Sequence, residues 1–302
     1  MYDVIVIGGG PAGLTAALYA LRANKSVLII EKGGFGGQIT YSPKVENIPG
    51  FISLSGNEFA EKLTEQVMEQ GADIEIATVT GVKDNGTNKT VVTDSGDFVG
   101  TTVIIATGAK HRLLGLDREE QFVGEGISFC AVCDGAFYKD KTVAVIGGGN
   151  SALQEALLLS EGCKKVIMVQ NLDRFTGEER LLEQLKAKSN VAFITSAVVN
   201  RLIGEKDLEA IEIRHQDSGE LSTLSIDGMF VAIGLLPQNE PFNNIIALNE
   251  YGYADSDEFC LTKTPGVFVA GDCRSKYVRQ VTTACADGAV AALAACRYID
   301  GQ

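Results

Sequence analysis

Two cysteines separated by two residues, Cys130 and Cys133, are followed directly by the carboxylate of Asp134. This spacing suits either half of a zinc site or a dithiol that can close into a disulfide. A zinc site needs further ligands, but the other five cysteines never pair at short spacing, and His111 and His215 stand alone. We therefore predict a redox-active pair, in which one thiol has a lowered pKa, and no metal site.

The overall composition limits the class of protein. The chain has 302 residues, of which 45% are hydrophobic, which is enough for two domains with separate cores. Its net charge of −13 argues against nucleic-acid binding. It has no apolar run of the roughly 18 residues that a membrane-spanning helix needs, and its start lacks the basic residues of a signal sequence. Seven cysteines without framework spacing fit a reducing compartment, so we expect a cytoplasmic protein.

A dinucleotide-binding fingerprint opens the chain. Residues 3–7 predict an apolar strand, Gly8, Gly10 and Gly13 form a glycine-rich turn, and residues 14–23 predict a helix. A second strand, residues 27–30, ends at the acidic Glu31. In such a unit the pyrophosphate binds at the helix N-terminus and the carboxylate binds a ribose diol, so we predict a nucleotide here.

The same unit returns 139 residues later, with a strand at 142–146, a glycine turn at 147–152, a helix at 153–160 and a strand at 166–169. Gly8 corresponds to Gly147 and Gly13 to Ala152 without a gap. We therefore predict an α/β fold with two Rossmann-like, three-layer dinucleotide-binding domains. Further expected elements are a helix at 57–70, strands at 74–79 and 90–93, apolar strands that end on Gly108 and Gly234, and a helix at 283–298.

The order of the motifs resembles the low-molecular-weight thioredoxin reductase family over nearly the whole chain. The motifs are the first glycine turn, Gly-Gly-Gln at 36–38, Glu-Asn-x-Pro-Gly at 46–50, Ala-Thr-Gly at 106–108, Cys-x-x-Cys-Asp at 130–134, the second glycine turn, Ala-Ile-Gly-x-x-Pro at 232–237, Ala-Gly-Asp at 270–272 and Arg-Gln at 279–280. The resemblance implies a fold of the pyridine nucleotide-disulfide oxidoreductase type. Its FAD domain would comprise residues 1–112 and 242–302, interrupted at 113–241 by an NAD(P)H-domain-like domain that carries the cysteine pair.

The resemblance also implies the residues that hold FAD. Glu31 would bind the adenosine ribose, Asp272 the ribitol, and residues 279–281 would face the isoalloxazine edge. A Gln or Asn in a glycine-rich loop often only caps a turn, which is the alternative for single positions. The expected contacts are Gly8, Gly10, Ala12, Gly13, Glu31, Gln38, Asn47, Val79, Thr107, Gly108, Asp272, Arg279, Gln280 and Val281.

By the same resemblance, electrons pass from reduced FAD to the Cys130–Cys133 disulfide and then to thioredoxin. Cys133 would be the sulfur on the flavin side, Cys130 would attack the partner disulfide, and Asp134 would be the acid that serves both steps. The alternative for Asp134 is a turn residue before Gly135. The inserted domain would rotate about hinges near 110–116 and 237–242, and the enzyme would be a homodimer.

The chain departs from the family after the second strand of its second unit. NADPH-using members carry His-Arg-Arg-x-x-x-Arg there, whereas residues 170–176 read Gln-Asn-Leu-Asp-Arg-Phe-Thr and place no arginine at those positions. Gln170 also stands where the first unit has Glu31, so the carboxylate for an NAD ribose is missing. This pattern resembles the ferredoxin-dependent flavin thioredoxin reductases and predicts reduced ferredoxin as the electron donor. The alternative is an NADH- or NADPH-dependent thioredoxin reductase with an atypical nucleotide site.

Two further classes of protein share some of these features. A ferredoxin-NADP reductase of similar fold lacks the cysteine pair, and a flavoprotein that only carries electrons needs neither the disulfide nor the adjacent acid. Cys130, Cys133 and Asp134 therefore argue against both.

Overall fold

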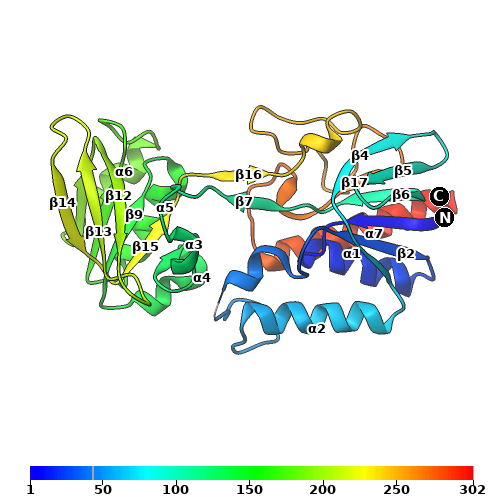
Figure 1. The fold of residues 1–302 in the computed structure, drawn as a ribbon, viewed down its shortest axis with the longest axis horizontal. Helices are drawn as coiled ribbons and strands as arrows, with labels where there is room; N and C mark the ends of the chain where they lie inside the picture. Colours follow the sequence, from blue (N-terminus) through cyan, green and yellow to red (C-terminus); the bar gives the residue numbers. More distant parts are fainter. Residues whose placement is uncertain (43, 302) are drawn as a thin grey trace. The chain divides into compact units, whose positions relative to one another are not determined.

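A computed structural model describes residues 1–42 and 44–301 of the chain (Figure 1). The chain divides into two compact units: a terminal unit of Met1–Lys110 and Leu236–Gln302, and an inserted unit of His111–Leu235. The expected boundaries followed residues 112 and 241, whereas these units divide after Lys110 and Leu235. Two short strands, β7 (Ala109–His111) and β16 (Leu235–Pro237), pair with each other where the chain passes between the units.

The terminal unit is built on a seven-stranded sheet in the order β3-β2-β1-β6-β5-β4, with β17 also paired to β6. Parallel pairing joins β3, β2, β1, β6 and β17, and antiparallel pairing joins β4 to β5 and β5 to β6. The strands are β1 (Tyr2–Ile7), β2 (Val27–Glu31), β3 (Asp73–Ile76), β4 (Val79–Asp84), β5 (Lys89–Thr93), β6 (Asp97–Ile105) and β17 (Val267–Val269).

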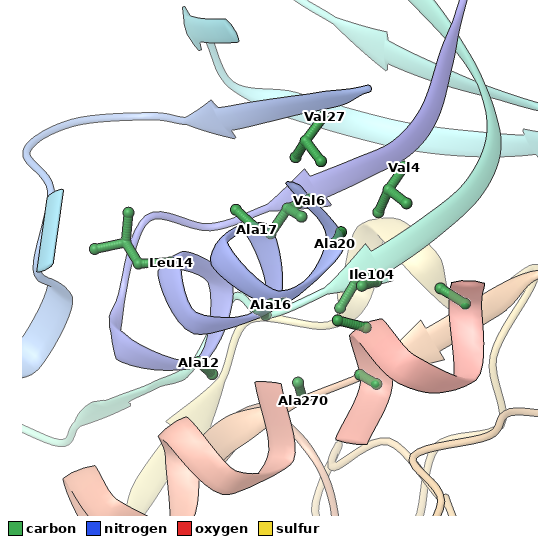
Figure 2. Close-up of a cluster of buried hydrophobic side chains, with 14 of the residues drawn as sticks. Val4, Val6, Ala12, Leu14, Ala16, Ala17, Ala20, Val27, Ile104 and Ala270 are labelled. Carbon is green, nitrogen blue, oxygen red and sulfur yellow. The ribbon is translucent and has the colours of Figure 1, made fainter. Parts of the chain in front are cut away.

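Helices α1 (Pro11–Arg22) and α7 (Val281–Asp300) pack on one face of this sheet, and α2 (Gly56–Glu69) packs beside α1. Figure 2 shows alanines of α1 against Val4 and Val6 of β1. A Cβ added at Gly288 of α7 would lie 2.1 Å from the carbonyl oxygen of Ala12, so only glycine permits this close helix contact. On the other face, Phe242 of η3 (Glu240–Phe242) is buried against the alternate residues of β1 and β2.

The inserted unit contains a five-stranded parallel sheet in the order β11-β10-β9-β15-β8 and a three-stranded antiparallel sheet, β12-β13-β14. Its strands are β8 (Ile127–Ser128), β9 (Thr142–Ile146), β10 (Lys165–Val169), β11 (Val191–Ile194), β12 (Ala197–Ile203), β13 (Ala210–His215), β14 (Leu221–Ser225) and β15 (Gly228–Val231). Its helices are α3 (Glu119–Phe122), α4 (Ala131–Asp134), η2 (Gly135–Tyr138), α5 (Asn150–Ser160) and α6 (Glu179–Lys186). Val143 and Val145 of β9 pack with α4, α5 and α6, whereas Ala144 and Ile146 pack with β12 and β13.

The predicted α/β fold with two Rossmann-like units is confirmed. The strand expected at 74–79 is wrong, because β3 ends at Ile76 and β4 begins at Val79. Between them the Ala77 N–H donates to the carbonyl of Glu31, and the Thr78 N–H donates to Oδ1 of Asp94. These bonds turn the chain out of the parallel part of the sheet. No described helix is long and apolar enough to cross a membrane.

Candidate redox site and cofactor cradle

Cys130 and Cys133 form a disulfide at the start of α4, with their Cα atoms 5.3 Å apart. Cys130 is the N-cap residue of this short helix, and its N–H donates to the Ser128 hydroxyl at the end of β8 over 3.1 Å. Val132, between the two cysteines, is 63% exposed. The parallel sheet thus anchors one end of the dithiol segment, while the residue between the sulfurs lies at the surface.

Asp134 is the last residue of α4 and lies half-buried beside the disulfide. The Ser128 hydroxyl donates to its Oδ2 over 2.6 Å, and its Oδ1 is buried without a hydrogen-bond partner among the described residues. Burial raises the pKa of Asp134, and the Ser128 hydrogen bond partly opposes that rise. A carboxyl with a raised pKa keeps its proton at higher pH, as a general acid requires.

A second partly buried carboxyl, Glu155 of α5, interacts electrostatically with Asp134. Its Oε2 is buried without a partner in the described structure, and burial together with the charge of Asp134 raises its pKa to about 8. Burial and the same charge raise the pKa of Tyr138 in η2 to about 12. The sequence did not single out Glu155, because a glutamate in the middle of a helix usually faces water.

In the terminal unit, a cavity of about 260 Å³ opens where β1 and β2 end. Four expected cofactor residues line it: Gly8, Glu31, Val79 and Thr107. The Glu31 carboxylate accepts the Gly9 N–H over 2.7 Å and that of Gly33 over 2.9 Å. The two backbone bonds fix this carboxylate at the rim, where a ribose diol can reach it.

The first glycine turn needs its glycines for close approach. Gly8 has φ +111°, and a Cβ there would lie 2.4 Å from the carbonyl oxygen of Ala106. A Cβ at Gly13 would lie 1.9 Å from the carbonyl oxygen of Gly8. In contrast, a Cβ at Gly10, the N-cap of α1, would meet nothing closer than 3.9 Å. The turn is therefore tight against the sheet but open at the helix N-terminus, where a pyrophosphate binds in such units.

Two of the residues expected to contact FAD have buried polar atoms without hydrogen-bond partners among the described residues. Oδ1 of Asp272 in η4 (Gly271–Cys273) and Nε of Arg279 are both buried without partners among the described residues. Burial raises the pKa of Asp272, while the charges of Lys276 and Arg279 act in the opposite direction. The Arg279 guanidinium lies 4.2 Å from the centre of the Tyr253 ring. Buried groups without partners are costly, so both fit contacts to a bound polar ligand such as FAD.

The remaining expected contacts lie in the same unit. The side-chain amide of Asn47 donates to Oε1 of Gln280 over 3.2 Å and joins the 46–50 motif to the N-terminus of α7. Gln280 is the N-cap residue of α7, and Val281 begins the helix. Gln38 is exposed in η1 (Gly37–Tyr41), and Gly108 has φ +67°. Ala12 is buried, and a Cβ at Gly271 would lie 2.7 Å from its own Cβ.

In the second glycine turn, the side chain of Gln170 is turned into its own loop. Its Oε1 accepts the Asn171 N–H over 3.1 Å, and its Nε2 donates to the Arg174 carbonyl over 3.2 Å. Gln170 is buried against Gly148, whereas the Arg174 and Asp173 side chains are 78% and 79% exposed. No described residue therefore repeats here the contact between Glu31 and Gly9 of the first turn.

Comparisons with known proteins agree with these features. Residues 2–288 match the family described as pyridine nucleotide-disulphide oxidoreductase. The chain is 39% identical to thioredoxin reductase of Listeria innocua over 301 residues, which is 99% of this chain and 94% of that protein. It is also 39% identical over 301 residues to a protein of Clostridium pasteurianum described as a 34.2 kDa protein in a rubredoxin operon, covering 99% of this chain and 98% of that one.

Among solved structures, thioredoxin reductase from Streptococcus pyogenes matches with a TM-score of 0.96 and 38% identity, over 100% of this chain and 99% of that chain. None of these matches assigns the chain to a ferredoxin-dependent branch. The proteins of this family are FAD-binding flavoproteins, and the cofactor of this chain is FAD. The chain belongs to the pyridine nucleotide-disulphide oxidoreductases and, within them, to the low-molecular-weight thioredoxin reductases.

Proposed function

We propose that this thioredoxin reductase works through Cys130, Cys133 and Asp134. The observation that carries this assignment is the Cys130–Cys133 disulfide directly beside a carboxyl whose pKa is raised by burial. FAD, when bound, supplies the electron pair that reduces this disulfide. Cys130 then attacks the disulfide of thioredoxin, and Cys133 resolves the mixed disulfide. Asp134 gives a proton to the sulfur that leaves, which makes that sulfur a better leaving group.

FAD is proposed to bind across the terminal unit. Glu31 would accept hydrogen bonds from the adenosine ribose hydroxyls, and the N-terminus of α1 would face the pyrophosphate. Asp272 would accept a hydrogen bond from the ribitol. The cavity at Gly8, Glu31, Val79 and Thr107 and the unpaired Oδ1 of Asp272 support this placement. The full set is Gly8, Gly10, Ala12, Gly13, Glu31, Gln38, Asn47, Val79, Thr107, Gly108, Asp272, Arg279, Gln280 and Val281.

Reduced ferredoxin is the proposed electron donor. The support comes from the second glycine turn. The Gln170 side chain is hydrogen-bonded to the backbone of its own loop, and no arginine stands at the positions where NADPH-using members hold the 2′-phosphate. A charge-assisted phosphate contact contributes about 1.5–3 kcal/mol, so the loss of several weakens NADPH binding by orders of magnitude. The alternative is a pyridine nucleotide donor with an atypical site, and the close similarity to proteins named thioredoxin reductase favours it.

Ferredoxins are usually acidic, so docking needs a basic patch on a chain of net charge −13. The inserted unit offers Lys164, Lys165, Arg174, Arg180, Lys186 and Lys188. Three of these residues form salt bridges with neighbouring carboxylates: Lys186 with Glu179, Lys188 with Glu161 and Arg174 with Asp173. These pairs reduce the positive field of the patch and weigh against tight ferredoxin docking.

The donor test mixes the oxidised, FAD-loaded enzyme anaerobically with reduced ferredoxin, NADPH or NADH and follows flavin bleaching, then turnover with thioredoxin. The proposal expects fast bleaching by ferredoxin and slow bleaching by micromolar NADPH or NADH. Fast bleaching and multiple turnovers with either nucleotide would instead establish the alternative. A homodimer and a cytoplasmic location remain proposals from the family resemblance and the cysteine composition.

A further inference from the structure

The surroundings of Asp134 contain one group that the proposed exchange chemistry leaves unused. Ala152, Ala156 and Leu159 of α5 share a buried cluster with Ala131 of α4. Leu159 also reaches Gly135, where a Cβ would lie 3.2 Å from its Cδ2. Glu155 stands between these residues along the helix, so the face of α5 that packs on the dithiol segment also carries a carboxyl.

Neither carboxyl is fully paired. Oδ1 of Asp134 and Oε2 of Glu155 are both buried without a hydrogen-bond partner in the described part of the chain. The other titratable group beside the pair is Tyr138 of η2, on which the charges of Asp207, Asp227 and Glu125 also act, while β9 and β10 present apolar side chains to α5. Two close carboxyls in such a setting do not both ionise readily, so the pair retains a proton that isolated carboxyls would lose.

We propose that Glu155 is the proton reservoir of the dithiol site and reprotonates Asp134 between the two steps of thiol–disulfide exchange. This inference rests on the proposed roles of Cys130, Cys133 and Asp134. Glu155 is thus a positioning and proton-supplying residue that acts through Asp134 and does not touch the reacting sulfurs.

The exchange consumes two protons, one at each step. In the first step the Cys130 thiolate bonds to one thioredoxin sulfur, the thioredoxin disulfide breaks, and the released sulfur takes the proton of Asp134. In the second step the Cys133 thiolate bonds to Cys130, the mixed disulfide breaks, and the second released sulfur needs another proton. Glu155 provides it by protonating Asp134 after the first step.

At the end of the exchange, thioredoxin has gained two electrons and two protons, and the enzyme disulfide has re-formed. Asp134 has passed on one proton of its own and one from Glu155. The next reduction of the disulfide restores the two thiolates, and the carboxyls recover two protons from water. One turnover needs two protons, of which Asp134 delivers the first directly and Glu155 supplies the second through Asp134.

The test compares the FAD-loaded wild type with Glu155→Gln and with the matched control Glu183→Gln, which alters an exposed glutamate of α6. Each enzyme is reduced, mixed with oxidised thioredoxin at pH 7 and acid-quenched over time, and the mixed disulfide is separated from the products by mass. We expect Glu155→Gln to form the adduct at the wild-type rate and to resolve it at least about tenfold more slowly, so that the adduct accumulates. Glu183→Gln should match the wild type in both steps.

A purely structural role of Glu155 would slow both steps together, and equal rates in Glu155→Gln and the wild type would overturn the inference alone. A wild-type enzyme that forms no adduct would overturn the proposed function and the inference with it. An infrared readout is independent of turnover: the wild type should show a protonated-carboxyl band at pH 7 that fades as the pH rises through about 8 and is missing in Glu155→Gln. Identical spectra of the two proteins would also contradict the proposal.

Discussion

The Ser128 hydroxyl donates a 2.6 Å hydrogen bond to Oδ2 of Asp134, across a segment that contains both redox cysteines. The same hydroxyl accepts the Cys130 N–H over 3.1 Å. One serine at the end of a strand therefore orients both the Asp134 carboxylate and the Cys130 peptide. Because the bond favours the ionised carboxylate, it holds the pKa of Asp134 below the level that burial alone would set.

Ser128→Ala should therefore raise the pKa of Asp134. The acid would keep its proton to higher pH, so the alkaline fall in the single-turnover rate of exchange with thioredoxin should move to higher pH. Ser128→Thr keeps the hydroxyl and serves as the control, with a profile near that of the wild type. If the rate of Ser128→Ala falls at the same alkaline pH as that of the wild type, the hydrogen bond does not set the pKa of Asp134.

The two cysteines should fail in different ways. Cys133→Ser leaves Cys130 able to attack but removes the resolving thiol, so a stable adduct with thioredoxin should accumulate on Cys130. Cys130→Ser should trap no thioredoxin, and its remaining Cys133 thiolate should give a long-wavelength charge-transfer absorbance with oxidised FAD. Nonreducing mass analysis and an absorbance spectrum check both results. The opposite pattern would reverse the assignment of the two sulfurs.

Glu155 should make the fold less stable as the pH rises. Its pKa is about 8 in the folded protein against an ordinary 4.5, so between these values the folded state binds a proton that the unfolded chain releases. The free energy of unfolding therefore falls across that window, by up to about 1.4 kcal/mol per pH unit for this group. Glu155→Gln removes the titration, so urea unfolding at pH 5 and pH 8 should show the variant gaining a few kcal/mol relative to the wild type at the higher pH. Parallel pH dependences in the two proteins would mean that Glu155 is already ionised in the fold.

Gly13→Ala should abolish tight FAD binding. The added methyl group would lie 1.9 Å from the carbonyl oxygen of Gly8 and would force the first glycine turn apart. Gly149→Ala, in the second turn, is the matched control, because nothing lies within 4 Å of its added Cβ. Flavin absorbance retained after desalting measures the outcome, with loss expected only in Gly13→Ala. Retention of FAD in both variants would show that the first glycine turn does not contribute to FAD binding.

Local patterns predicted much of this fold. The 139-residue repeat and its glycine turns predicted the strands β1, β2, β9 and β10 to within a residue at each end, because short apolar runs and glycines specify them locally. The sequence did not reveal the sheet β12-β13-β14, whose strands mix buried apolar residues with exposed polar ones and lack a long apolar run. It also missed Ser128 and Glu155, because their importance depends on the packing of β8 and α5 around Asp134 and not on any local pattern.

The most direct test of the central claim counts thiols. The FAD-loaded enzyme is fully reduced under anaerobic conditions, freed of excess donor, denatured and titrated before and after it meets oxidised thioredoxin. We predict two additional thiols per chain on reduction, located at Cys130 and Cys133, and their loss as thioredoxin gains two. An enzyme whose flavin is reduced while the thiol count stays unchanged, or whose two new thiols remain after thioredoxin is added, would contradict the account.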